Sequence, residues 1–374
     1  MRIPLSAPDI NEADIAAVTA VLRTSRLSLG PQMEEFERSF ARHIGVSQAV
    51  AVSSGTSALH LCIRALGISE GDEVIVPSFA FIAVANVLRY ERAVPVFVDI
   101  DPPTLNLDPG SIEEAITPRT RAILVVHTFG CPAALDEILE IARRHRLFVI
   151  EDACEALGAQ FDGRQVGSFG DAAVFGFYPN KQITSGEGGM LVTNDSKVAA
   201  LARKLRNQGR RESGEWLQHE ELGYNYRISE LNCALGASQL QRLEGILERR
   251  EAVAREYHRR LETEPSLQLP ALELPRRRIS WFVYVLRLRE TFSAAQRDHI
   301  IQEMASRGIA CGRYFAPIHL QPAYRSQPHR CMRLIHTESI APRTLALPFF
   351  NKISVEQIEE VCQSLGEVLR KVRQ

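Results

Sequence analysis

The stretch Ala173-Val-Phe-Gly-Phe-Tyr-Pro-Asn-Lys-Gln-Ile-Thr-Ser-Gly-Glu-Gly-Gly-Met190 decides how the rest of the sequence is interpreted. An apolar run typical of a buried strand ends at a Pro-Asn turn, and a single lysine, Lys181, follows it. A glycine-rich segment then leads into a second apolar run, Met190–Thr193. A lysine held on a loop between two buried strands can form a Schiff base with an aldehyde.

Another apolar run lies upstream and ends in a carboxylate, Phe148-Val-Ile-Glu-Asp152. Open α/β sheets bind ligands at the carboxyl ends of their strands, so Asp152 is a candidate partner for a pyridinium nitrogen. A helix N-cap or a salt-bridge partner is the alternative role for this carboxylate. Lys181 and Asp152 together are the two protein groups that the chemistry of pyridoxal 5′-phosphate (PLP) needs.

A third feature is the segment Val52-Ser-Ser-Gly-Thr-Ser-Ala-Leu-His-Leu61, in which a strand ends and a helix begins at about Ser57. The free N–H groups and partial positive charge of a helix N-terminus form a natural phosphate seat. Gly55 permits close approach of the backbone, and Thr56 and Ser57 add hydroxyl groups. An ordinary N-cap at Ser57 is the alternative explanation.

Seven short apolar runs predict the strands of one sheet. Most are rich in Val and Ile and lack strict polar alternation, which is typical of strands buried on both faces of a parallel sheet. Helical patterns such as Ser57–Leu66 and Ala133–His145 separate several of them, which indicates the α/β class, with a mostly parallel seven-stranded sheet covered by helices. The runs are Ala49–Ser53, Glu73–Pro77, Pro95–Ile100, Ala122–His127, Phe148–Asp152, Ala172–Phe177 and Gly189–Thr193.

The pattern changes after Thr193, and a second, smaller C-terminal α/β domain is expected there. We expect the large domain over residues 1–245, including the N-terminal segment, and the small domain over residues 246–374. The elements predicted in this part are a helix at Ser196–Asn207, a polar loop at Gln208–Gly223, a long helix at Ser229–Leu261 kinked at Gly245, a strand at Trp281–Leu288, a helix at Ala294–Ser306, a strand at Ile309–Tyr314 and a helix at Val355–Val372.

Composition excludes several classes of function. The net charge of −1 gives no general attraction to nucleic acid or to an anionic membrane. The basic runs Arg203–Arg211 and Arg276–Arg278 are interpreted as solvated faces or salt-bridge partners, with a grip on an anionic substrate as the alternative. Seven cysteines, an odd number without Cys-x-x-Cys spacing, argue against a disulfide framework and a metal site.

Targeting signals are also missing from the pattern. The residues after Met1 contain no apolar signal core, and no apolar run of 18 residues occurs. We therefore expect a cytoplasmic protein without a membrane partner.

Eight segments together resemble the DegT/DnrJ/EryC1/StrS family of PLP-dependent nucleotide-sugar aminotransferases, which have aminotransferase fold type I. They span nearly the whole chain in the expected order. The segments are Leu27-Ser-Leu-Gly-Pro31, Ser53-Ser-Gly-Thr-Ser-Ala-Leu-His60, Val76-Pro-Ser-Phe-Ala-Phe81, Glu151-Asp-Ala-Cys-Glu-Ala156, Phe175-Gly-Phe-Tyr-Pro-Asn-Lys181, Gly186-Glu-Gly-Gly189, Gly223-Tyr-Asn-Tyr-Arg227 and Pro317-Ile-His-Leu-Gln-Pro322.

The resemblance implies a role for each matching cofactor residue. Lys181 would be the catalytic lysine that binds the PLP aldehyde and carries a proton between the cofactor and the sugar carbon. Asp152 would bind the pyridine nitrogen, and Thr56 and Ser57 would hold the phosphate. Phe81 matches the aromatic side chain that stacks on the ring, with a core phenylalanine as the alternative.

The resemblance also implies a homodimer. Asn225 and Arg227 match a segment that reaches the cofactor phosphate from the neighbouring subunit. His319 matches a histidine near the sugar nucleotide, and we place Tyr314 with it on the substrate side; a satisfied loop histidine is the alternative for His319.

Two positions depart from the commoner family pattern, and one histidine needs a separate interpretation. Gly176 stands where many relatives have a phosphate-binding serine, so other groups must hold the phosphate. Glu155 is often Gln or His in relatives, near the pyridoxal O3′, and a glutamate there would repel a phenolate unless one of them is protonated or a cation lies near. His127 is interpreted as a core or supporting histidine rather than a catalytic one.

The sequence therefore predicts an aminotransferase that moves an amino group from an amino acid, most simply glutamate, to a nucleotide-linked keto-sugar, for cell-surface polysaccharide or amino-sugar biosynthesis. A sugar dehydratase of the same family is an alternative, but such members lack the lysine that Lys181 provides. A non-catalytic sensor is another, and the near-neutral charge and lack of a DNA-binding appendage disfavour it. The nucleotide, the sugar and the aminated carbon stay open.

Overall fold

The structure is a computed structural model that describes residues 2–211 and 218–373. Its main sheet has eight strands, in the order β1-β9-β8-β5-β4-β2-β3-β13. All seven predicted strands belong to it, and β13 adds an eighth at the edge beyond β3. The strands are β1 (Gln48–Val52), β2 (Glu73–Pro77), β3 (Val94–Val98), β4 (Thr120–Val126), β5 (Phe148–Asp152), β8 (Ala172–Gly176), β9 (Gly189–Thr193) and β13 (Arg330–Cys331).

The sheet is mostly parallel, as the sequence predicts. The strands from β8 through β13 pair in parallel, whereas β9 runs antiparallel to both β1 and β8. Because β8 and β9 are antiparallel neighbours, the segment between them must turn back at the carboxyl end of β8. This turn contains Lys181.

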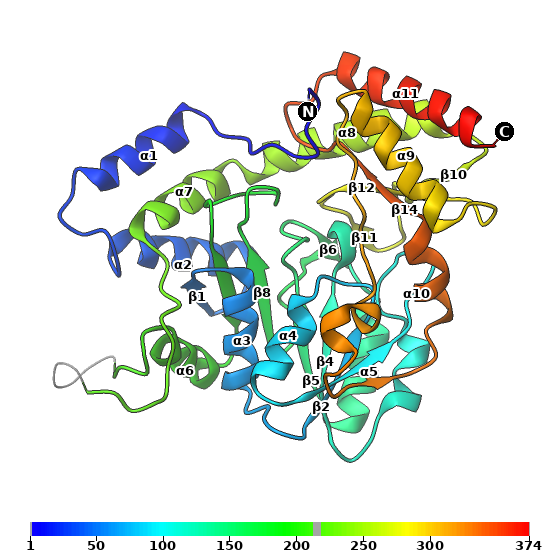
Figure 1. The fold of residues 1–374 in the computed structure, drawn as a ribbon. Helices are drawn as coiled ribbons and strands as arrows, with labels where there is room; N and C mark the ends of the chain where they lie inside the picture. Colours follow the sequence, from blue (N-terminus) through cyan, green and yellow to red (C-terminus); the bar gives the residue numbers. More distant parts are fainter. Residues whose placement is uncertain (1, 212–217, 374) are drawn as a thin grey trace.

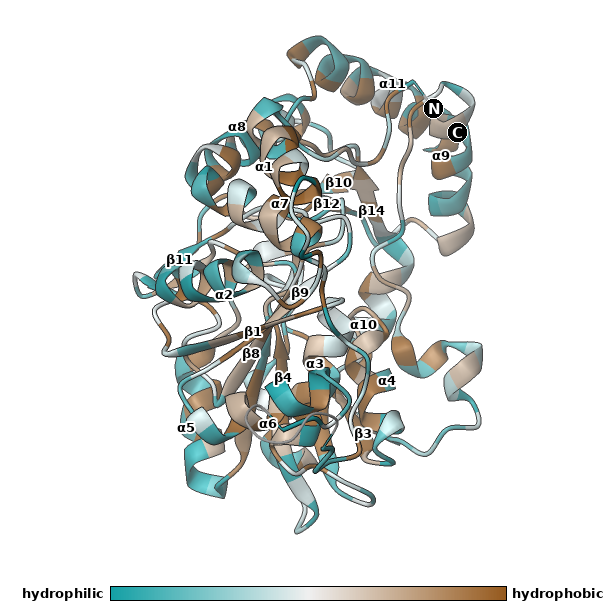
Figure 2. Ribbon diagram, turned by 90° about the vertical axis from the view of Figure 1, so that its left-hand side faces the viewer, coloured by the Kyte–Doolittle hydropathy of each residue, from teal (hydrophilic) through white to brown (hydrophobic). Residues whose placement is uncertain are grey.

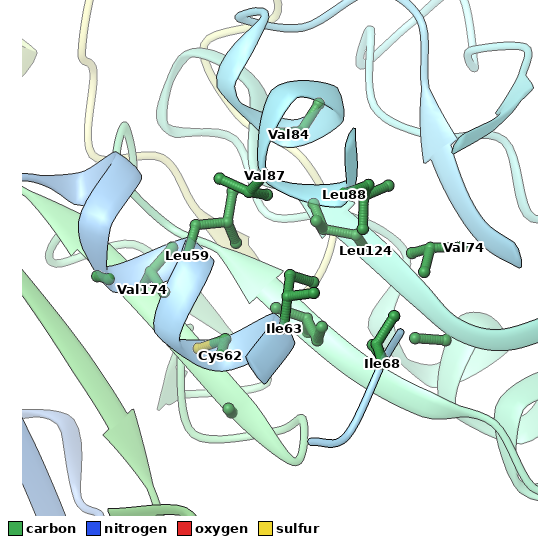
Figure 3. Close-up of a cluster of buried hydrophobic side chains, with 14 of the residues drawn as sticks. Leu59, Cys62, Ile63, Ile68, Val74, Val84, Val87, Leu88, Leu124 and Val174 are labelled. Carbon is green, nitrogen blue, oxygen red and sulfur yellow. The ribbon is translucent and has the colours of Figure 1, made fainter. Parts of the chain in front are cut away.

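Helices cover both faces of the sheet, and alternate strand residues serve the two faces. On one face, residues such as Val74, Leu124 and Val174 join a core with α3 (Gly55–Ala65), α4 (Ala83–Tyr90) and α6 (Ser196–Arg206). Figure 3 shows Leu59 and Ile63 of α3 beside Val87 and Leu88 of α4 in this core. The fully buried aliphatic side chains hold the N-terminus of α3 at a fixed place over the sheet.

The opposite face packs against a second set of helices. The residues of β1, β8 and β9 that point there contact α2 (Pro31–Ile44), α7 (Glu230–Gln241) and α8 (Leu243–Leu261). Those of β2, β4 and β5 contact α5 (Leu135–His145). Figure 2 draws β1, β4 and β8 largely in brown between helices with teal outer surfaces. Both faces of the sheet are therefore buried, which explains the unbroken apolar runs in the sequence.

The N-terminal helices α1 (Glu12–Leu22) and α2 were not predicted. Three backbone N–H groups at the start of α2, those of Gly30, Gln32 and Met33, donate to the carboxylate of Glu230 at 2.8–3.1 Å. Glu230 lies in α7 and is buried. Because its carboxylate accepts these N–H groups, it serves as the N-cap of α2 from 200 residues away in the sequence. This long-range cap has no local sequence signal.

The long helix predicted over Ser229–Leu261 is two helices, α7 (Glu230–Gln241) and α8 (Leu243–Leu261). The break lies at Arg242, whose φ of −112° and ψ of 16° leave the helical region, and not at Gly245 as predicted. The guanidinium of Arg242 pairs with Asp14 at 2.7 Å and with Asp9 at 3.5 Å. Tertiary ion pairs at Arg242, rather than the backbone freedom of Gly245, coincide with the break.

The C-terminal part has its own sheet (Figure 1) and its own hydrophobic core. A three-stranded antiparallel sheet, β10-β12-β14, packs with the long helices around the stacked rings of Tyr257 and Tyr284. The elements are β10 (Leu267–Gln268), β12 (Tyr284–Leu288), β14 (Thr344–Leu347), α9 (Ala294–Ser306), α10 (Ile335–Ile340) and α11 (Val355–Arg373). The domain division at residues 245 and 246 stays a prediction.

Two predicted strands of this part need correction. Ile309–Tyr314 is not a strand: Ile309 and Gly312 form isolated bridges, to Ile3 and Ala346. The strand predicted over Trp281–Leu288 begins at Tyr284 instead, because Trp281 has a φ of 46°. Its neighbours Ser280 and Phe282 donate backbone N–H bonds to Gly130 and Phe129 of the large sheet's loops.

A third, small sheet contains a hairpin that follows Asp152 in the sequence. It has the order β11-β6-β7, with β6 (Gln160–Phe161), β7 (Arg164–Gln165) and β11 (Arg277–Arg278). Beside it, Arg276 pairs with Asp136 and Asp162, and Arg278 pairs with Glu244. The basic run 276–278 thus provides salt-bridge partners, which was the first of its two interpretations.

Within the loop predicted over Gln208–Gly223, residues 212–217 lie outside the described residues. Across the described ranges, no helix combines the length and the apolar character that a membrane span needs.

Candidate active site

A cavity of about 440 Å³ opens at the carboxyl ends of β4, β5 and β8. The start of α3 and the loop after β8 complete its wall on the large-sheet side, and Phe282, Tyr314 and Phe315 close it from the C-terminal part. It has the size of a pocket for a small cofactor with its substrate. Its lining residues are Ser54, Gly55, Thr56, Leu59, Phe81, Ala83, Val126, Asp152, Cys154, Glu155, Gly176, Phe177, Tyr178, Asn180, Lys181, Glu187, Gly188, Phe282, Tyr314 and Phe315.

The N-terminus of α3 forms one end of the cavity. Ser54 is the N-cap, and its side chain accepts a bond of 3.0 Å from the backbone N–H of Ser57. The hydroxyl of Ser57 lies 2.9 Å from that of Ser54 and 3.1 Å from that of Ser53. Ser57 is buried and does not line the cavity. The N-cap expected at Ser57 lies at Ser54 instead, and Ser57 is the residue whose N–H the cap accepts. Thr56 does line the cavity, next to the positive end of the helix.

Glycines allow this turn to lie directly on the sheet. A Cβ atom at Gly189 would lie 2.3 Å from the backbone oxygen of Ser54 and 2.6 Å from the nitrogen of Gly55. A Cβ atom at Gly55 would lie 2.8 Å from the sulfur of Cys154. At Gly176 the nearest atom would be the same sulfur, at 3.4 Å, an ordinary contact. Position 189 is therefore restricted to glycine by the backbone of the α3 turn.

Asp152 stands at the last position of β5 and lines the cavity. Its Oδ1 accepts the backbone N–H of Cys154 at 3.0 Å, which fixes the direction of the carboxylate. Burial, with Asp152 as the second cause, raises the pKa of the Cys154 thiol well above its usual value. Cys154 is therefore a protonated, neutral wall of the cavity at neutral pH.

The preceding carboxylate, Glu151, points to the other side of β5 and has a structural role. It accepts backbone N–H bonds of 2.7–2.8 Å from Gly167, Phe169 and Gly170, and His127 Nε2 lies 3.0 Å from its Oε2. Burial raises the pKa of the Glu151 carboxyl, but the bonds from His127 and the backbone outweigh burial and keep that pKa below its usual value.

His127 is thereby assigned to the core. Its Nδ1 accepts the backbone N–H of Ala133 at 3.1 Å, so Nε2 carries the hydrogen that is donated to Glu151. Both side chains are fully buried. His127 supports the end of β4 and does not line the cavity, which agrees with its interpretation as a supporting residue.

Lys181 projects into the cavity from the turn after β8. Its backbone N–H donates to the carbonyl of Tyr178 at 2.9 Å, and this bond closes the turn. The Nζ atom lies 3.7 Å from Oε1 of Glu155 and 4.0 Å from the centre of the Phe282 ring. The next residue, Gln182, is buried and donates to the Glu155 carbonyl at 2.5 Å and to the Ser280 hydroxyl at 3.0 Å. The amine is therefore held between a carboxylate and an aromatic face.

Six predicted site residues meet in this cavity: Thr56, Phe81, Asp152, Glu155, Lys181 and Tyr314. Four do not line it. One is Ser57, which is buried as described above. Asn225 and Arg227 lie in the segment 223–227, where Arg227 donates to Asn207 Oδ1 at 3.0 Å. His319 is bound by Ser78, at 2.7 Å from Nδ1, and by Glu338, at 3.3 Å from Nε2. These contacts are those of a satisfied loop histidine, and its substrate role stays a prediction.

Several lining residues were not singled out from the sequence. Ser54, Cys154, Tyr178, Asn180 and Glu187 lie inside the quoted segments, so their place beside Thr56, Asp152 or Lys181 in the sequence was a usable signal. Phe282 and Phe315 had no such signal, because they come from the C-terminal part through backbone contacts between distant loops.

The donor set of the cavity fits PLP. A lysine amine, a carboxylate at the end of β5 and a helix N-terminus with a hydroxyl beside it face one space, and Phe81 adds an aromatic wall. These groups match the aldehyde, the ring nitrogen, the phosphate and the ring face of that cofactor. Two observations support PLP as the ligand: the chemical character of these groups, and the fact that they line one cavity.

Comparison with known proteins gives a consistent result. The sequence matches the family model described as the DegT/DnrJ/EryC1/StrS aminotransferase family over residues 8–366. It is 40% identical over 370 residues to the GDP-perosamine synthase of Caulobacter vibrioides, with 98% of each chain covered. The crystal structure of the aminotransferase TlmJ from Streptoalloteichus hindustanus is similar with a TM-score of 0.93 and 33% identity, covering 100% of both chains. The PLP form of Spr1654 from Streptococcus pneumoniae is similar with a TM-score of 0.94 and 28% identity, again over 100% of both chains.

The glycine contacts lead to a prediction about stability. Gly189→Ala should lower the free energy of unfolding by about 1–3 kcal/mol, because the new methyl group meets the rigid backbone of Ser54 and Gly55. Gly176→Ala, the matched control at the paired position of β8, should change it by less than about 1 kcal/mol. Urea unfolding of the two variants and the wild type measures both values. Equal stability of the two variants would show that the α3 turn adapts freely.

Proposed function

This chain belongs to the DegT/DnrJ/EryC1/StrS aminotransferase family and is an aminotransferase, and we propose that it moves an amino group from glutamate to a nucleotide-linked keto-sugar. The observation that carries the proposal is the meeting of Lys181, Asp152 and the N-terminus of α3 at one cavity. Enzymes of this family depend on PLP. The sugar substrate is supported by the 40% identity to a protein named GDP-perosamine synthase.

Residues of this chain would hold the cofactor at three points. Thr56 and the free N–H groups of α3 would bind its phosphate, Asp152 would hold its ring nitrogen in the protonated form, and Lys181 would bind its aldehyde carbon. Phe81, whose side chain lines the cavity, would stack on the ring. When bound, PLP supplies an electron sink that lets a bond at the substrate's amino-bearing carbon break.

The protein residues would then carry out the proton transfers. Among the described residues, Lys181 is the one lysine that lines the cavity, and its amine is the group placed to take a proton from a bound substrate carbon and return it. Phe282, Tyr314 and Phe315 line the opposite wall and would limit the access of water. Burial raises the pKa of the Tyr314 phenol, so Tyr314 stays a neutral hydrogen-bond donor at neutral pH.

A homodimer with shared sites is part of the proposal. Asn225 is exposed, and it lies between two anchored tyrosines. Tyr226 OH is 3.0 Å from His60 Nδ1, and Tyr224 OH donates to Glu91 at 3.2 Å. The segment is thus firmly attached to its own subunit, while Asn225 and Arg227 stay outside the cavity of that subunit. Gly176 offers no hydroxyl to a phosphate, and groups from a second subunit would compensate for it.

A substrate panel tests the proposed reaction. Purified protein with PLP should convert a keto-sugar linked to GDP, UDP or dTDP, with glutamate as donor, and the GDP-linked sugar is the first to try because of the Caulobacter relative. Asp152→Asn should still bind PLP, but its activation free energy should be about 3–4 kcal/mol higher than that of the wild type, because an amide cannot hold the ring nitrogen protonated. Turnover is followed by mass spectrometry of the sugar nucleotide. Wild-type inactivity on the whole panel, or near-normal turnover by Asp152→Asn, would contradict the proposal.

Subunit mixing tests the shared site. Arg227→Ala should weaken retention of PLP and lose turnover for that reason, and Lys181→Ala should abolish turnover. Co-refolded mixtures of the two inactive variants should regain activity, because one site of each mixed dimer has both residues intact. Sedimentation and activity assays measure assembly and rescue. A fully active monomer, or no rescue in proven mixed dimers, would contradict sharing of the site.

A further inference from the structure

Lys181 and Glu155 form an ion pair inside the cavity. Nζ and Oε1 are 3.7 Å apart, and the two side chains are 16% and 8% exposed. The same amine lies 4.0 Å from the centre of the Phe282 ring. Distances between acid–base partners are often long before a ligand binds, so 3.7 Å is within reach of a proton transfer after a small side-chain movement.

Within residues 2–211 and 218–373, the surroundings of Glu155 offer little else that would stabilise a negative charge. Its Oε2 accepts one backbone N–H, from Phe129 at 3.0 Å. The titratable groups that face it from the neighbouring elements are Lys181, Asp152, Cys154 and Tyr314. Lys181 is the cation among them, and the Asp152 carboxylate disfavours a second negative charge.

The energetics of a buried carboxylate depend on that single cation. Burial is the largest cause that raises the pKa of the Glu155 carboxyl, and attraction to Lys181 opposes it. A buried charge that loses its partner is costly, and a group in this position takes up a proton instead. The pair is therefore stable as two opposite charges or as two neutral groups.

We propose that Glu155 is the proton partner of Lys181: its carboxylate is ionised only while Lys181 is positively charged, and it becomes a neutral carboxylic acid when that charge is removed. In the transfer within the pair, an N–H bond of the ammonium breaks and an O–H bond forms at Oε1 of Glu155. One positive and one negative charge disappear together, and no other reagent takes part.

This behaviour would change what Glu155 offers to a ligand. As a neutral acid, Glu155 donates a hydrogen bond into the cavity, whereas a carboxylate there would repel an anionic oxygen. The coupling of Glu155 to Lys181 rests on the geometry of the chain alone. Its consequence for a bound cofactor rests on the proposed function.

The stability of the cofactor-free, full-length protein tests the coupling. Lys181→Met removes the ammonium and keeps the side-chain stem, and Glu155→Gln keeps a carbonyl oxygen that can accept the Phe129 N–H. The free energies of unfolding of the wild type, both single variants and the double variant are measured against pH by urea unfolding. The ratio of the unfolding equilibrium constant of Lys181→Met to that of the double variant reports the contribution of Glu155 to stability when its cation is absent.

The raised pKa of Glu155 sets the direction in which the stability of Lys181→Met changes with pH. At pH values below the usual pKa range of glutamate, the Glu155 carboxyl of Lys181→Met is protonated in both the folded and the unfolded state. The stability that the protonated carboxyl contributes is then fully present. Above that range the unfolded state releases the proton first, so the unfolding equilibrium constant should rise tenfold per pH unit relative to the double variant, until the folded carboxyl also ionises. This window should extend to higher pH in Lys181→Met than in the wild type. Parallel profiles of Lys181→Met and the double variant would overturn the proposal.

Infrared spectroscopy gives a second, independent measurement. At neutral pH, Lys181→Met should show the carbonyl band of a protonated carboxylic acid, and the double variant should lack it. If Lys181→Met does not fold, the same band should appear when PLP is added to the wild type and not when it is added to Glu155→Gln. Absence of the band in the folded Lys181→Met protein would overturn the proposal. Because the first comparison uses no cofactor, it is independent of the success of the proposed aminotransferase reaction.

Discussion

The close contact between the α3 turn and the start of β9 is the constraint on which the site depends. The backbone of Ser54 and Gly55 lies where a Cβ of Gly189 would be, and Gly189 pairs with Gly176 across the two antiparallel strands. This contact fixes the positive end of α3 beside the strands that carry the Lys181 turn. Since Asp152 ends the neighbouring parallel strand β5, three separate segments meet at one cavity without a long loop to position any of them.

Three carboxylates near the end of β5 show how environment separates their roles. Glu151 accepts three backbone N–H bonds and faces His127, so it is a fixed structural anion. Asp152 faces the cavity and accepts one local N–H, which leaves its second oxygen available to a ligand. Glu155 has one N–H donor and one nearby cation, which makes its charge depend on Lys181. Sequence alternation along β5 places Glu151 and Asp152 on opposite sides of the strand.

The parts of this structure that have local signals could be predicted from the sequence. Buried strands of the large sheet, a helix directly after the first strand and the lysine turn all follow from patterns within about ten residues, although the N-cap of that helix lies at Ser54 and not at Ser57. Parts that depend on distant residues were missed or misplaced. The break at Arg242 coincides with ion pairs to Asp9 and Asp14, and Phe282 reaches the cavity because Trp281 adopts a positive φ next to the Phe129–Gly130 loop. Asn225 and Arg227 do not line the cavity of this chain, and their placement at a site rests on the proposed dimer.

Chemical trapping of the cofactor is the most direct test of the central claim that Lys181 is the covalent anchor in this cavity. Protein incubated with PLP is treated with borohydride, which makes the bond between the cofactor carbon and the protein nitrogen permanent, and is then digested for peptide mass spectrometry. The account predicts a single modified lysine, Lys181, in the peptide that contains Asn180 and Gln182. Modification of a different lysine with Lys181 unmodified would contradict it.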